Sequence, residues 1–434
     1  MNRKTWLALL AGEGCLLLLL GTFALGMGLG WFEKPAQTVF EPEPTPPTTV
    51  ATEPPTTEAT QPPTTEATEP PTTEATEPEP AEVVYTLTFA GDCTLGTMYQ
   101  YYNASSCFPA VVGDNYAYPF ANVQDWFATD DFTMVNLEGP LTNEGSPAEK
   151  RFAFRGSPDF AQVLPAGSVE CVSLANNHSM DFGTVGYEST KTALDGVGVA
   201  YAGDGDSCLV ETERGLKIGV FAVAFSVSTD YMADSIAALR EAGAEIVIVS
   251  FHWGVEGYYR HTYDQTSLGH AAIDAGADIV FGHHPHVLEE VEDYNGGVIY
   301  YSLGNFAFGG NGDPRDYDTA LISQQVIRDV DGTVRLGAYT LVPCSISSVS
   351  YPNNYQPTPA EAGSERYQRV LDKLTGNFTG ANLPNSYEDE DEEEETTAPT
   401  EESTEAPTET PTEASTEAPT EAPTEAPTEA PAEG

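Results

Sequence analysis

The sequence is poor in basic side chains, with 17 Lys and Arg against 67 Asp and Glu and a formal net charge of −50. Residues 36–82 and 387–434 contain no Lys or Arg at all. Nucleic-acid binding depends on basic residues that neutralise phosphates, and no basic patch with interleaved aromatic residues occurs here. The composition therefore excludes a nucleic-acid partner.

Cysteine is also scarce, with six residues in the chain and no CxxC or zinc-finger spacing. Five of them follow the N-terminal apolar run: Cys93, Cys107, Cys171, Cys208 and Cys344. An odd number leaves at least one thiol unpaired in a monomer, so a complete disulfide framework is not implied. The sequence also lacks a GxSxG elbow, a P-loop and a GxGxxG motif after a strand, which excludes three common types of catalytic or nucleotide site.

Two segments have the composition of chain that cannot bury a core. Residues 35–82 and 387–434 consist mainly of Pro, Thr, Ala and Glu, with PPTTEAT repeats in the first and TEAP repeats in the second. We expect both to be disordered, in part as extended polyproline II spacers. The run EDEDEEEE at 388–395 is either a solvated tail or an electrostatic brush that repels anionic polymer or collects divalent cations.

The N-terminus has the pattern of a membrane anchor. Arg3 and Lys4 precede an apolar run that is clearest at residues 15–32, CLLLLLGTFALGMGLGWF. This length suits one membrane span with its amino end in the cytoplasm, so residues 1–34 are predicted to form a retained anchor. A cleaved signal peptide is the alternative, but the apolar run is long for one and no clear small-x-small cleavage site follows. The prediction places the protein in the cell membrane, with the rest of the chain outside the cytoplasm.

Residues 83–386 are long enough for one large core, and no linker-like segment divides them. Apolar runs of strand length alternate with segments of helical period, which predicts an α/β fold with buried parallel strands. The expected strands are VVYTLTFA, DFTMVNL, VECVSLA, KIGVFAVAF, AEIVIVSF, ADIVFG and GGVIYYSL, and the expected helices include TVGYESTKTALDGV, ADSIAALREAGA and SLGHAAIDAGAD. From Ala320 onward, alternating strands around Asp331-Gly332 predict an antiparallel hairpin.

Polar residues follow six of these runs at their carboxyl ends. The clusters are Gly91-Asp92, Asn136-Leu137-Glu138, Asn176-Asn177-His178 with Asp181, His252-Trp253-Gly254, GHHPH at 282–286, and Gly304-Asn305. Ligand sites of open α/β sheets form outside these strand ends, so residues distant in sequence are expected to converge there. A single His or Asp in such a place is more often a turn residue, but six clusters in register favour a polar cleft.

The converging set contains carboxylate, amide and imidazole groups without thiolate. Such a set suits Mn, Zn or Fe, and we expect one or two ions. His284 and His286 would serve different ions if two ions lay ~3.5–4 Å apart with a carboxylate bridging them. Pro285 is expected to favour extended backbone at His284 and to give the loop one rigid shape. Convergence also requires that Asp92 and His286 lie within ~10 Å of each other, since metal–ligand bonds span only about 2 Å. His261 and His270 are expected to lie outside the site.

The ordered motifs FAGDCTLG, VNLEGPLT, SLANNHSMDFG, SFHWGVE, GHHPHVLEEVE and YSLGNF resemble those of the CapA family of capsule and poly-γ-glutamate synthesis proteins. The resemblance covers about residues 84–345. It implies a calcineurin-like metallophosphatase fold, a four-layer α-β-β-α sandwich of two sheets flanked by helices. It also agrees with membrane anchoring and an outward-facing domain.

The resemblance implies specific roles for residues of the site. Asp92 matches a first metal ligand and Glu138 a bridging carboxylate, while His283 would support its neighbours. The other implied metal ligands are Asn177, His252, His284 and His286. His178 matches the histidine that protonates a leaving oxygen or holds an oxyanion, and it is the candidate catalytic residue together with Asp181.

The chain departs from the phosphatase pattern in two places. Cys93 and Thr94 follow Asp92 where a D-x-H motif would carry histidine, and NLE replaces a GDxxD block. The domain would then bind one ion, recruit Asp181 as a ligand, or keep the cleft for binding polymer without cleaving it.

Two functions remain open at this point. One is a metal-dependent hydrolase or transferase acting on a phosphoester or a γ-glutamyl polymer. The other is a non-catalytic component of polymer binding or export, with Arg151, Arg155 and Arg260 available to carboxylates. The expected partners are an anionic cell-surface polymer such as poly-γ-glutamate, the membrane itself, and membrane proteins of capsule synthesis.

Overall fold

The computed structural model describes residues 81–384. The chain divides into two units, Met1–Thr76 and Glu77–Gly434, and the described residues all belong to the second. The predicted anchor, the acidic tail and the linker up to residue 80 lie outside the described residues, so the boundaries at 34, 82 and 386 stay predictions. No helix within residues 81–384 is long and apolar enough to cross a membrane.

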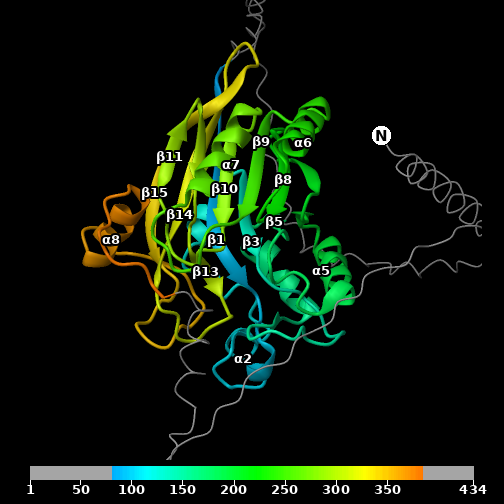
Figure 1. Ribbon diagram of the computed structural model, residues 1–434, viewed down its shortest axis with the longest axis vertical. Helices are drawn as coiled ribbons and strands as arrows, with labels where there is room; N and C mark the ends of the chain where they lie inside the picture. The colour runs from blue at the N-terminus through cyan, green and yellow to red at the C-terminus, as the bar shows by residue number, and fades with distance from the viewer. Residues whose placement is uncertain (1–80, 385–434) are drawn as a thin grey trace, which may run out of the picture. The chain divides into compact units, whose positions relative to one another are not determined.

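Two mixed β-sheets form the centre of the described unit (Figure 1). In order, the larger sheet contains β16 (Thr358–Pro359), β15 (Val334–Ser345), β14 (Asp318–Arg328), β1 (Val83–Thr94), β3 (Phe132–Leu137), β5 (Cys171–Ser173) and β6 (Ala200–Ala202), with β13 (Asn305–Phe308) also paired to β1. The smaller sheet contains β11 (Val291–Tyr294), β12 (Gly297–Tyr300), β10 (Ile279–His283), β9 (Ile246–His252), β8 (Lys217–Ala224) and β7 (Ser207–Glu211). A third pairing joins β2 (Thr97–Met98) and β4 (Phe154–Arg155).

Strand direction agrees with the sequence. β1, β3, β5 and β6 run parallel, as do β8, β9, β10 and β12. Their near-continuous apolar runs, such as IVIVSF in β9, are typical of parallel strands covered on both faces. The predicted hairpin is the antiparallel pair β14 and β15, and Gly332 in its turn has a φ of 88°.

The helices and short 3₁₀ segments complete the layers. They are η1 (Tyr99–Tyr101), α2 (Phe108–Val112), α3 (Gln124–Phe127), η2 (Pro158–Gln162), α4 (Val163–Ala166), α5 (Gly183–Val197), α6 (Thr229–Glu241), α7 (Tyr263–Asp274) and α8 (Glu365–Leu374). Polar caps fix where several of them begin. The Ser228 side chain accepts from the Tyr231 N–H at α6, and Thr262 and Gln265 form a reciprocal capping box at α7.

Three apolar clusters define the order of layers. The central cluster joins the facing sides of the sheets, where the Phe89 ring lies 5.0 Å from Phe281 and 5.5 Å from Tyr300 between centroids. A second cluster packs α5 through Leu194 against the outer face of the larger sheet. A third packs α6 and α7 against the outer face of the smaller sheet. This order is the expected four-layer α-β-β-α sandwich, and it is confirmed.

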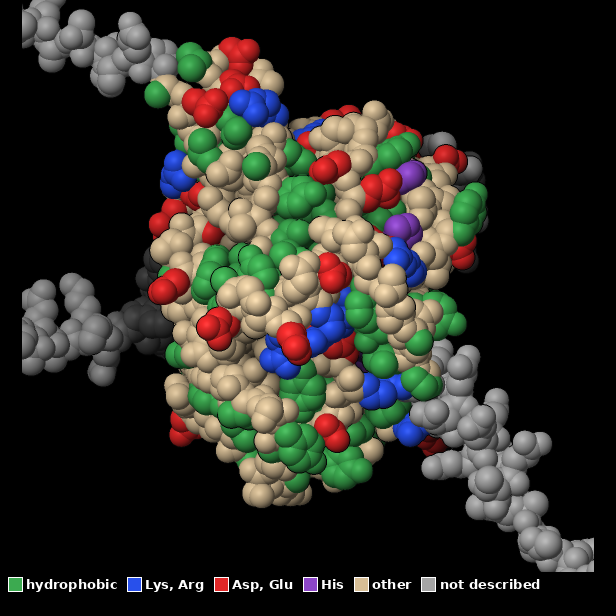
Figure 2. All heavy atoms as spheres, turned by 90° about the vertical axis from the view of Figure 1, so that its left-hand side faces the viewer, with side chains coloured by type: hydrophobic (Ala, Val, Ile, Leu, Met, Phe, Trp, Pro, Cys, Tyr) green, Lys and Arg blue, Asp and Glu red, His purple; other side chains and the backbone are tan. Residues whose placement is uncertain are grey.

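Helix α8 packs on β14 and β15, at the side of the larger sheet that faces the viewer in Figure 2. Lys and Arg side chains gather near the middle of that face. The helix is held by charge, since Arg369 and Lys373 both donate to Asp318. Lys373 also bonds Asp316, which receives a further hydrogen bond from the Tyr259 hydroxyl. We call Asp316, Asp318, Arg369 and Lys373 the α8 cluster.

Candidate metal centre

The carboxyl ends of parallel strands from both sheets meet at one edge of the described unit. β1 and β3 of the larger sheet lead to Asp92 and Glu138, and β9 and β10 of the smaller sheet lead to His252 and His283. The distances below place all six predicted metal ligands in one group: Asp92, Glu138, Asn177, His252, His284 and His286. Asp92 Oδ2 lies 3.4 Å from His286 Nδ1, so the convergence expected from sequence is present.

Asp92 is fully buried in a tight backbone setting. A Cβ at Gly91 would lie 1.9 Å from the Gly304 carbonyl oxygen, which explains why glycine precedes Asp92. The Asp92 N–H donates to that same carbonyl at 2.9 Å and ties β1 to the segment that leads into β13. Asn136 donates to Asp92 Oδ1 at 2.9 Å, and His283 Nδ1 lies 3.2 Å from the same oxygen. The carboxylate is therefore held in one orientation.

Glu138 lies at the centre of the group. Its side chain has no exposed surface, and neither carboxylate oxygen has a hydrogen-bond partner among the described residues. Oε1 is 3.7 Å from His286 Nε2, 3.8 Å from His252 Nε2 and 4.0 Å from His178 Nε2. A buried carboxylate left without donors costs several kcal/mol, at about 1–3 kcal/mol for each group that lacks a hydrogen bond. A bound cation would offset that cost.

A second set of donors surrounds His252. The Asn177 Oδ1 lies 2.9 Å from His252 Nε2, and the His284 Nδ1 lies 3.1 Å from the same nitrogen. Trp253 anchors the end of β9 by donating its indole N–H to the Tyr301 carbonyl at 2.9 Å. The amide oxygen and both imidazole nitrogens therefore point at one small volume.

The GHHPH loop differs from its expected geometry. His284 has a φ of 98° and His286 a φ of 57°, so the prediction of extended backbone at His284 is wrong. The positive φ values turn the chain sharply on either side of Pro285, and such strain persists only where surrounding contacts hold it. Here the His284 N–H lies 3.4 Å from Asp92 Oδ2, and the His286 ring reaches Asn305 Oδ1 at 2.9 Å. The turn brings both rings to the same side.

Glu256 is a site residue that the sequence reasoning did not single out. It lies in the loop after β9 and is 8% exposed. Its carboxylate and the rings of His284 and His286 offer donor atoms that all lie within 4.8 Å of one another, as do those of Asp92, Glu138 and His286. The signal was an acidic residue four positions after His252, in the quoted segment SFHWGVE.

The ionisation of the group follows from burial and from charge. Burial, with help from His284, lowers the pKa of His252 well below its usual value. Burial and the neighbouring His286 lower the pKa of His284 to about 4. Both rings are therefore neutral near pH 7, which is the form that binds a metal ion.

The acids and His286 are strongly coupled. Burial raises the pKa of Glu138 well above its usual value, although His286 opposes the shift. Burial alone would raise the pKa of Asp92, but the imidazoles of His283 and His286 outweigh it and hold that pKa well below its usual range. For His286, burial alone would lower the pKa, but Glu138 and Asp92 raise it to about 10. The carboxyl groups of Asp92 and Glu138 thus favour a positively charged group between them, either the protonated His286 ring or a cation.

His178 and Asp181 form a separate pair beside this group. The His178 Nδ1 lies 2.8 Å from Asp181 Oδ2, which also accepts the Phe154 N–H at 2.6 Å. The Lys150 Nζ also lies near Nδ1, at 3.3 Å, but the shorter contact is to the Asp181 carboxylate, which can only accept. Nδ1 therefore carries the proton, and Nε2 is directed toward Glu138. Lys150 bonds Asp181 Oδ1 and also donates to the Asn177 carbonyl at 3.0 Å. Asp181 is fully buried behind the ring, so it positions His178 and does not line the cleft.

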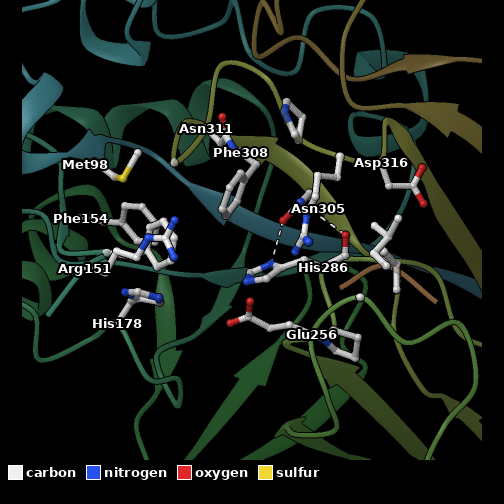
Figure 3. Close-up of a pocket in the computed structure, with 18 residues that line it drawn as sticks. Met98, Arg151, Phe154, His178, Glu256, His286, Asn305, Phe308, Asn311 and Asp316 are labelled. Carbon is white, nitrogen blue, oxygen red and sulfur yellow. Dashed lines mark hydrogen bonds between the residues drawn. The ribbon is translucent and has the colours of Figure 1, made fainter. Parts of the chain in front are cut away.

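A cleft of about 280 Å³ opens over the group. In Figure 3, Arg151, Phe154 and His178 lie on one side of the cleft, with His286 and Asn305 toward the other. Arg315 also lines it, so two arginines contribute to its wall. Of the other arginines considered from sequence, Arg260 is bound to Glu290 at 2.7 Å, and the Arg155 guanidinium lies 4.6 Å from the Tyr102 ring centroid. Neither is among the residues that line the cleft.

The donor set fits divalent metal. Metal–nitrogen and metal–oxygen bonds of about 2.0–2.2 Å place neighbouring ligand atoms about 3–4 Å apart. The separations between donor atoms around Glu138 and His252 lie between 2.9 and 4.0 Å. Two overlapping sets share Glu138: Asp92 with His286 on one side, and Asn177, His252 and His284 on the other.

The remaining histidines lie outside the site, as expected. His261 stacks on Tyr301 with ring centroids 3.8 Å apart and lies 3.1 Å from Glu290. His270 stacks on Tyr294 at 3.6 Å and lies 3.0 Å from Glu292. These contacts are ring packing and close approaches to a carboxylate, and neither ring faces the metal ligands.

Comparison with known proteins gives a consistent picture. A family model described as bacterial capsule synthesis protein PGA_cap matches residues 86–310, more than half of the chain. The PGA biosynthesis protein CapA of Bacillus subtilis is 30% identical over 283 residues, which cover 59% of this chain and 70% of that protein. The capsule biosynthesis protein CapA of Bacillus anthracis is 29% identical over 287 residues, covering 59% and 67%.

Among solved structures, Haemophilus influenzae NAD nucleotidase is 11% identical with a TM-score of 0.36, and the alignment covers 73% of this chain and 60% of that one. A similarity this weak adds nothing to the assignment of the site, which depends on the geometry of this chain.

Proposed function

The chain belongs to the bacterial capsule synthesis protein family, and on that premise we propose that residues 81–384 form a divalent-metal hydrolase or transferase. As a CapA-like protein it takes part in capsule or poly-glutamate synthesis. Its cleft would act on an anionic polymer or a phosphoester, with Mn, Zn or Fe as the metal and one or two ions bound.

The observation that supports the proposal most is the environment of Glu138. A carboxylate with no exposed surface, no hydrogen-bond donor among the described residues and three imidazole nitrogens within 4.0 Å is a poor structural element. The same carboxylate is a good bridging ligand. Its neighbours hold complementary donors on either side, so one or two cations would neutralise it.

A bound ion would supply Lewis acidity and lower the pKa of a coordinated water toward 7. The chain's own part begins with His178, whose Nε2 is directed toward Glu138 and whose ring lines the cleft. Nε2 would exchange a proton with the oxygen of the scissile group. Asp181 fixes the tautomer through the 2.8 Å bond at Nδ1, and Phe154 covers the ring at 4.4 Å between centroids, excluding water from one face.

Substrate recognition would use the arginines of the cleft. Arg151 and Arg315 line the wall above the metal ligands, where their guanidinium groups would bind carboxylates or phosphates by paired hydrogen bonds. The relatives are named for PGA and capsule synthesis, so poly-γ-glutamate or a similar anionic cell-surface polymer is the proposed substrate class. We place the cleft outside the cytoplasm, tethered by residues 1–34 beside membrane proteins of capsule synthesis. That placement depends on the sequence alone.

The test is the metal content of the full-length protein. After equilibration with Mn, Zn or Fe and removal of free ion, elemental analysis should find about one or two ions per wild-type chain. Glu138→Gln keeps the size of the side chain but removes its charge, so bound metal should fall at least about tenfold.

Glu289→Gln provides the matched control. Glu289 is an equally buried carboxylate, but its partner is the Gln265 amide at 2.7 Å, and it forms no ion pair with a histidine among the described residues. This variant should keep the wild-type metal content. Equal loss of metal in both variants, or a wild-type chain without metal, would contradict the proposal.

Non-catalytic binding of polymer is the second candidate, and the two cleft arginines support it without any chemistry. Binding of poly-γ-glutamate that survives chelation and falls as salt rises, in a protein with no turnover, would favour this candidate.

A further inference from the structure

We propose that the cleft is the docking surface for an acidic segment of the same chain, the run EDEDEEEE at residues 388–395. Docked there, the run would exclude an anionic polymer from the arginines and from the metal ligands. The competition with polymer rests on the proposed function, whereas docking itself does not.

The path of the chain before the run is fixed at the rim of the cleft. The Leu383 N–H donates to the Gly257 carbonyl at 3.0 Å, and the Leu383 side chain lines the cleft. One residue earlier, the Asn382 Oδ1 accepts the Tyr259 N–H at 3.1 Å. Arg315 donates to the carbonyl of Pro384. The described chain therefore ends against the loop that carries Glu256 and against a cleft arginine.

The acidic run begins close to this point. Three residues separate Pro384 from Glu388, and the four residue-to-residue steps span at most about 3.6 Å each in a fully extended chain, or about 14 Å in all. A short tether of this kind holds a segment at an effective concentration on the order of millimolar near its target. An individually weak interaction is enough for occupancy under those conditions.

Charge favours the cleft as the target. The run carries eight consecutive carboxylates, while Arg151 and Arg315 line the cleft and are both exposed. Two acidic groups also line it, Glu256 and Asp316. Asp316 is already neutralised by Lys373 at 2.6 Å, and Glu256 belongs to the candidate metal cluster. Bound cations would make the cleft still more attractive to carboxylates.

A photo-crosslink tests docking independently of any activity. The full-length protein would carry p-benzoylphenylalanine in place of Asp391, near the middle of the run, and crosslinked peptides would be identified by mass spectrometry. We expect links to the peptides that contain Arg151 and Arg315, and their loss at high salt. The same crosslinker at Glu417, in the later repeats, is the control and should give few links to those peptides.

Two outcomes of this experiment would overturn the proposal. Links spread over surfaces remote from the cleft, such as α5 or α6, would show that the run has no docking site. Links between copies, detected by mixing isotopically heavy and light protein, would show that the run binds a second molecule and not its own cleft.

Competition is tested by neutralising the run. Changing all eight residues to Gln or Asn in the full-length protein should tighten binding of a poly-γ-glutamate oligomer about tenfold, since a tethered competitor is removed. The matched control changes eight Glu between residues 402 and 429 to Gln, which alters the net charge equally and should leave binding as in the wild type. Equal effects of the two variants would overturn competition, whatever the crosslinks show. Failure of all variants to bind the oligomer would count against the proposed substrate class, and the crosslinks would still decide docking.

Discussion

Two groups of buried acids in this domain are neutralised in different ways. In the α8 cluster, Asp318 is 1% exposed, yet Arg369 donates to it twice, at 2.6 and 2.7 Å, and Lys373 lies 2.8 Å away. Burial alone would raise the pKa of Asp318, but these partners outweigh it and lower that pKa. Glu138 is buried to the same degree, but no Lys or Arg of residues 81–384 forms an ion pair with it, and burial raises its pKa.

The difference separates structure from chemistry. An acid whose counter-charges belong to the chain is complete as folded, and here it fastens α8 to the larger sheet. Glu138 is faced by imidazoles alone: burial keeps His252 and His284 neutral. The one positive charge that His286 can carry is shared between Glu138 and Asp92, so the two acids are not both neutralised by the chain. The stability of the α8 cluster should therefore be insensitive to chelators but sensitive to mutation of its residues. The stability of the group around Glu138 should depend on bound metal.

The largest expected effect comes from breaking the α8 cluster. Lys373→Met leaves Asp316 and Asp318 with part of their charge uncompensated in a buried site, so the free energy of unfolding should fall by about 3 kcal/mol. Urea unfolding of the full-length protein measures it, and metal content should not change.

Lys191→Met is the matched control, because Lys191 forms an exposed pair with Glu188 at 3.2 Å on α5. Its cost should be below about 1 kcal/mol. If both lysine variants lose the same small free energy of unfolding, the α8 cluster does not stabilise the packing of α8 on the larger sheet as we describe.

Metal removal should have the next largest effect. With free metal at 100 times its dissociation constant, binding stabilises the fold by about 2.7 kcal/mol, so chelation should lower the wild-type melting temperature. Glu138→Gln should respond to chelator much less than the wild type does, because it has lost the bridging carboxylate. Calorimetry of both proteins measures the difference, and Glu289→Gln should respond as the wild type does. A wild-type melting temperature insensitive to chelator would remove the contrast between the two groups.

A third acid, at the opposite end of the strands, sharpens the comparison. Glu170 directly precedes β5, and its carboxylate accepts the Thr133 N–H at 2.7 Å without a basic partner in that contact. Burial raises its pKa to about 7, although the Thr133 hydrogen bond opposes the shift and Asp130 adds to it. The folded carboxyl therefore holds its proton more tightly than the unfolded one, whose pKa is 4.5. Stability from this group is present below that value and is lost as pH rises toward 7.

Glu170→Gln removes this titration and keeps an acceptor for Thr133. Because the side chain is only partly buried, we expect the variant to gain about 1 kcal/mol over the wild type between pH 4.5 and 8. Urea unfolding at several pH values measures the gain. A difference between the two proteins that does not change with pH would contradict the assignment.

Much of the fold was predictable because buried parallel strands are written as continuous apolar runs. IVIVSF and ADIVFG became β9 and β10, and the Asp331-Gly332 turn joined β14 to β15. The layer order itself came from the family resemblance. The division of strands between two sheets depends on which side chains pack across the core, such as Phe89 on Phe281, and no local pattern contains that information. The short helices α2 and α3 were also missed, because their few residues pack on the rest of the domain and show no helical period of their own.

The site was predictable in composition and less so in geometry. Residues directly after strands, such as Asp92 and His252, converged as the strand-end rule requires. The positive φ at His284 was missed because a residue before proline prefers extended backbone. The contacts that hold the turn, such as those to Asp92 and Asn305, come from residues distant in sequence. Glu256 was missed because its position depends on how the loop after β9 folds back over the cleft. The identity of the metal and the chemistry stay predictions.

The site draws its groups from both sheets, with Asp92 and Glu138 on one and His252 and His283 on the other. Metal–ligand distances must lie within about 0.2 Å of their ideal values. The spacing between the two sheets therefore decides whether the ligands from both sheets can reach the same ion. Phe89, Phe281 and Tyr300 pack between the sheets and contribute to that spacing, although none of them lines the cleft. A larger or smaller side chain at one of these positions should abolish metal binding in a protein that still folds. Selection for the activity of the site would then also constrain the apolar side chains between the two sheets.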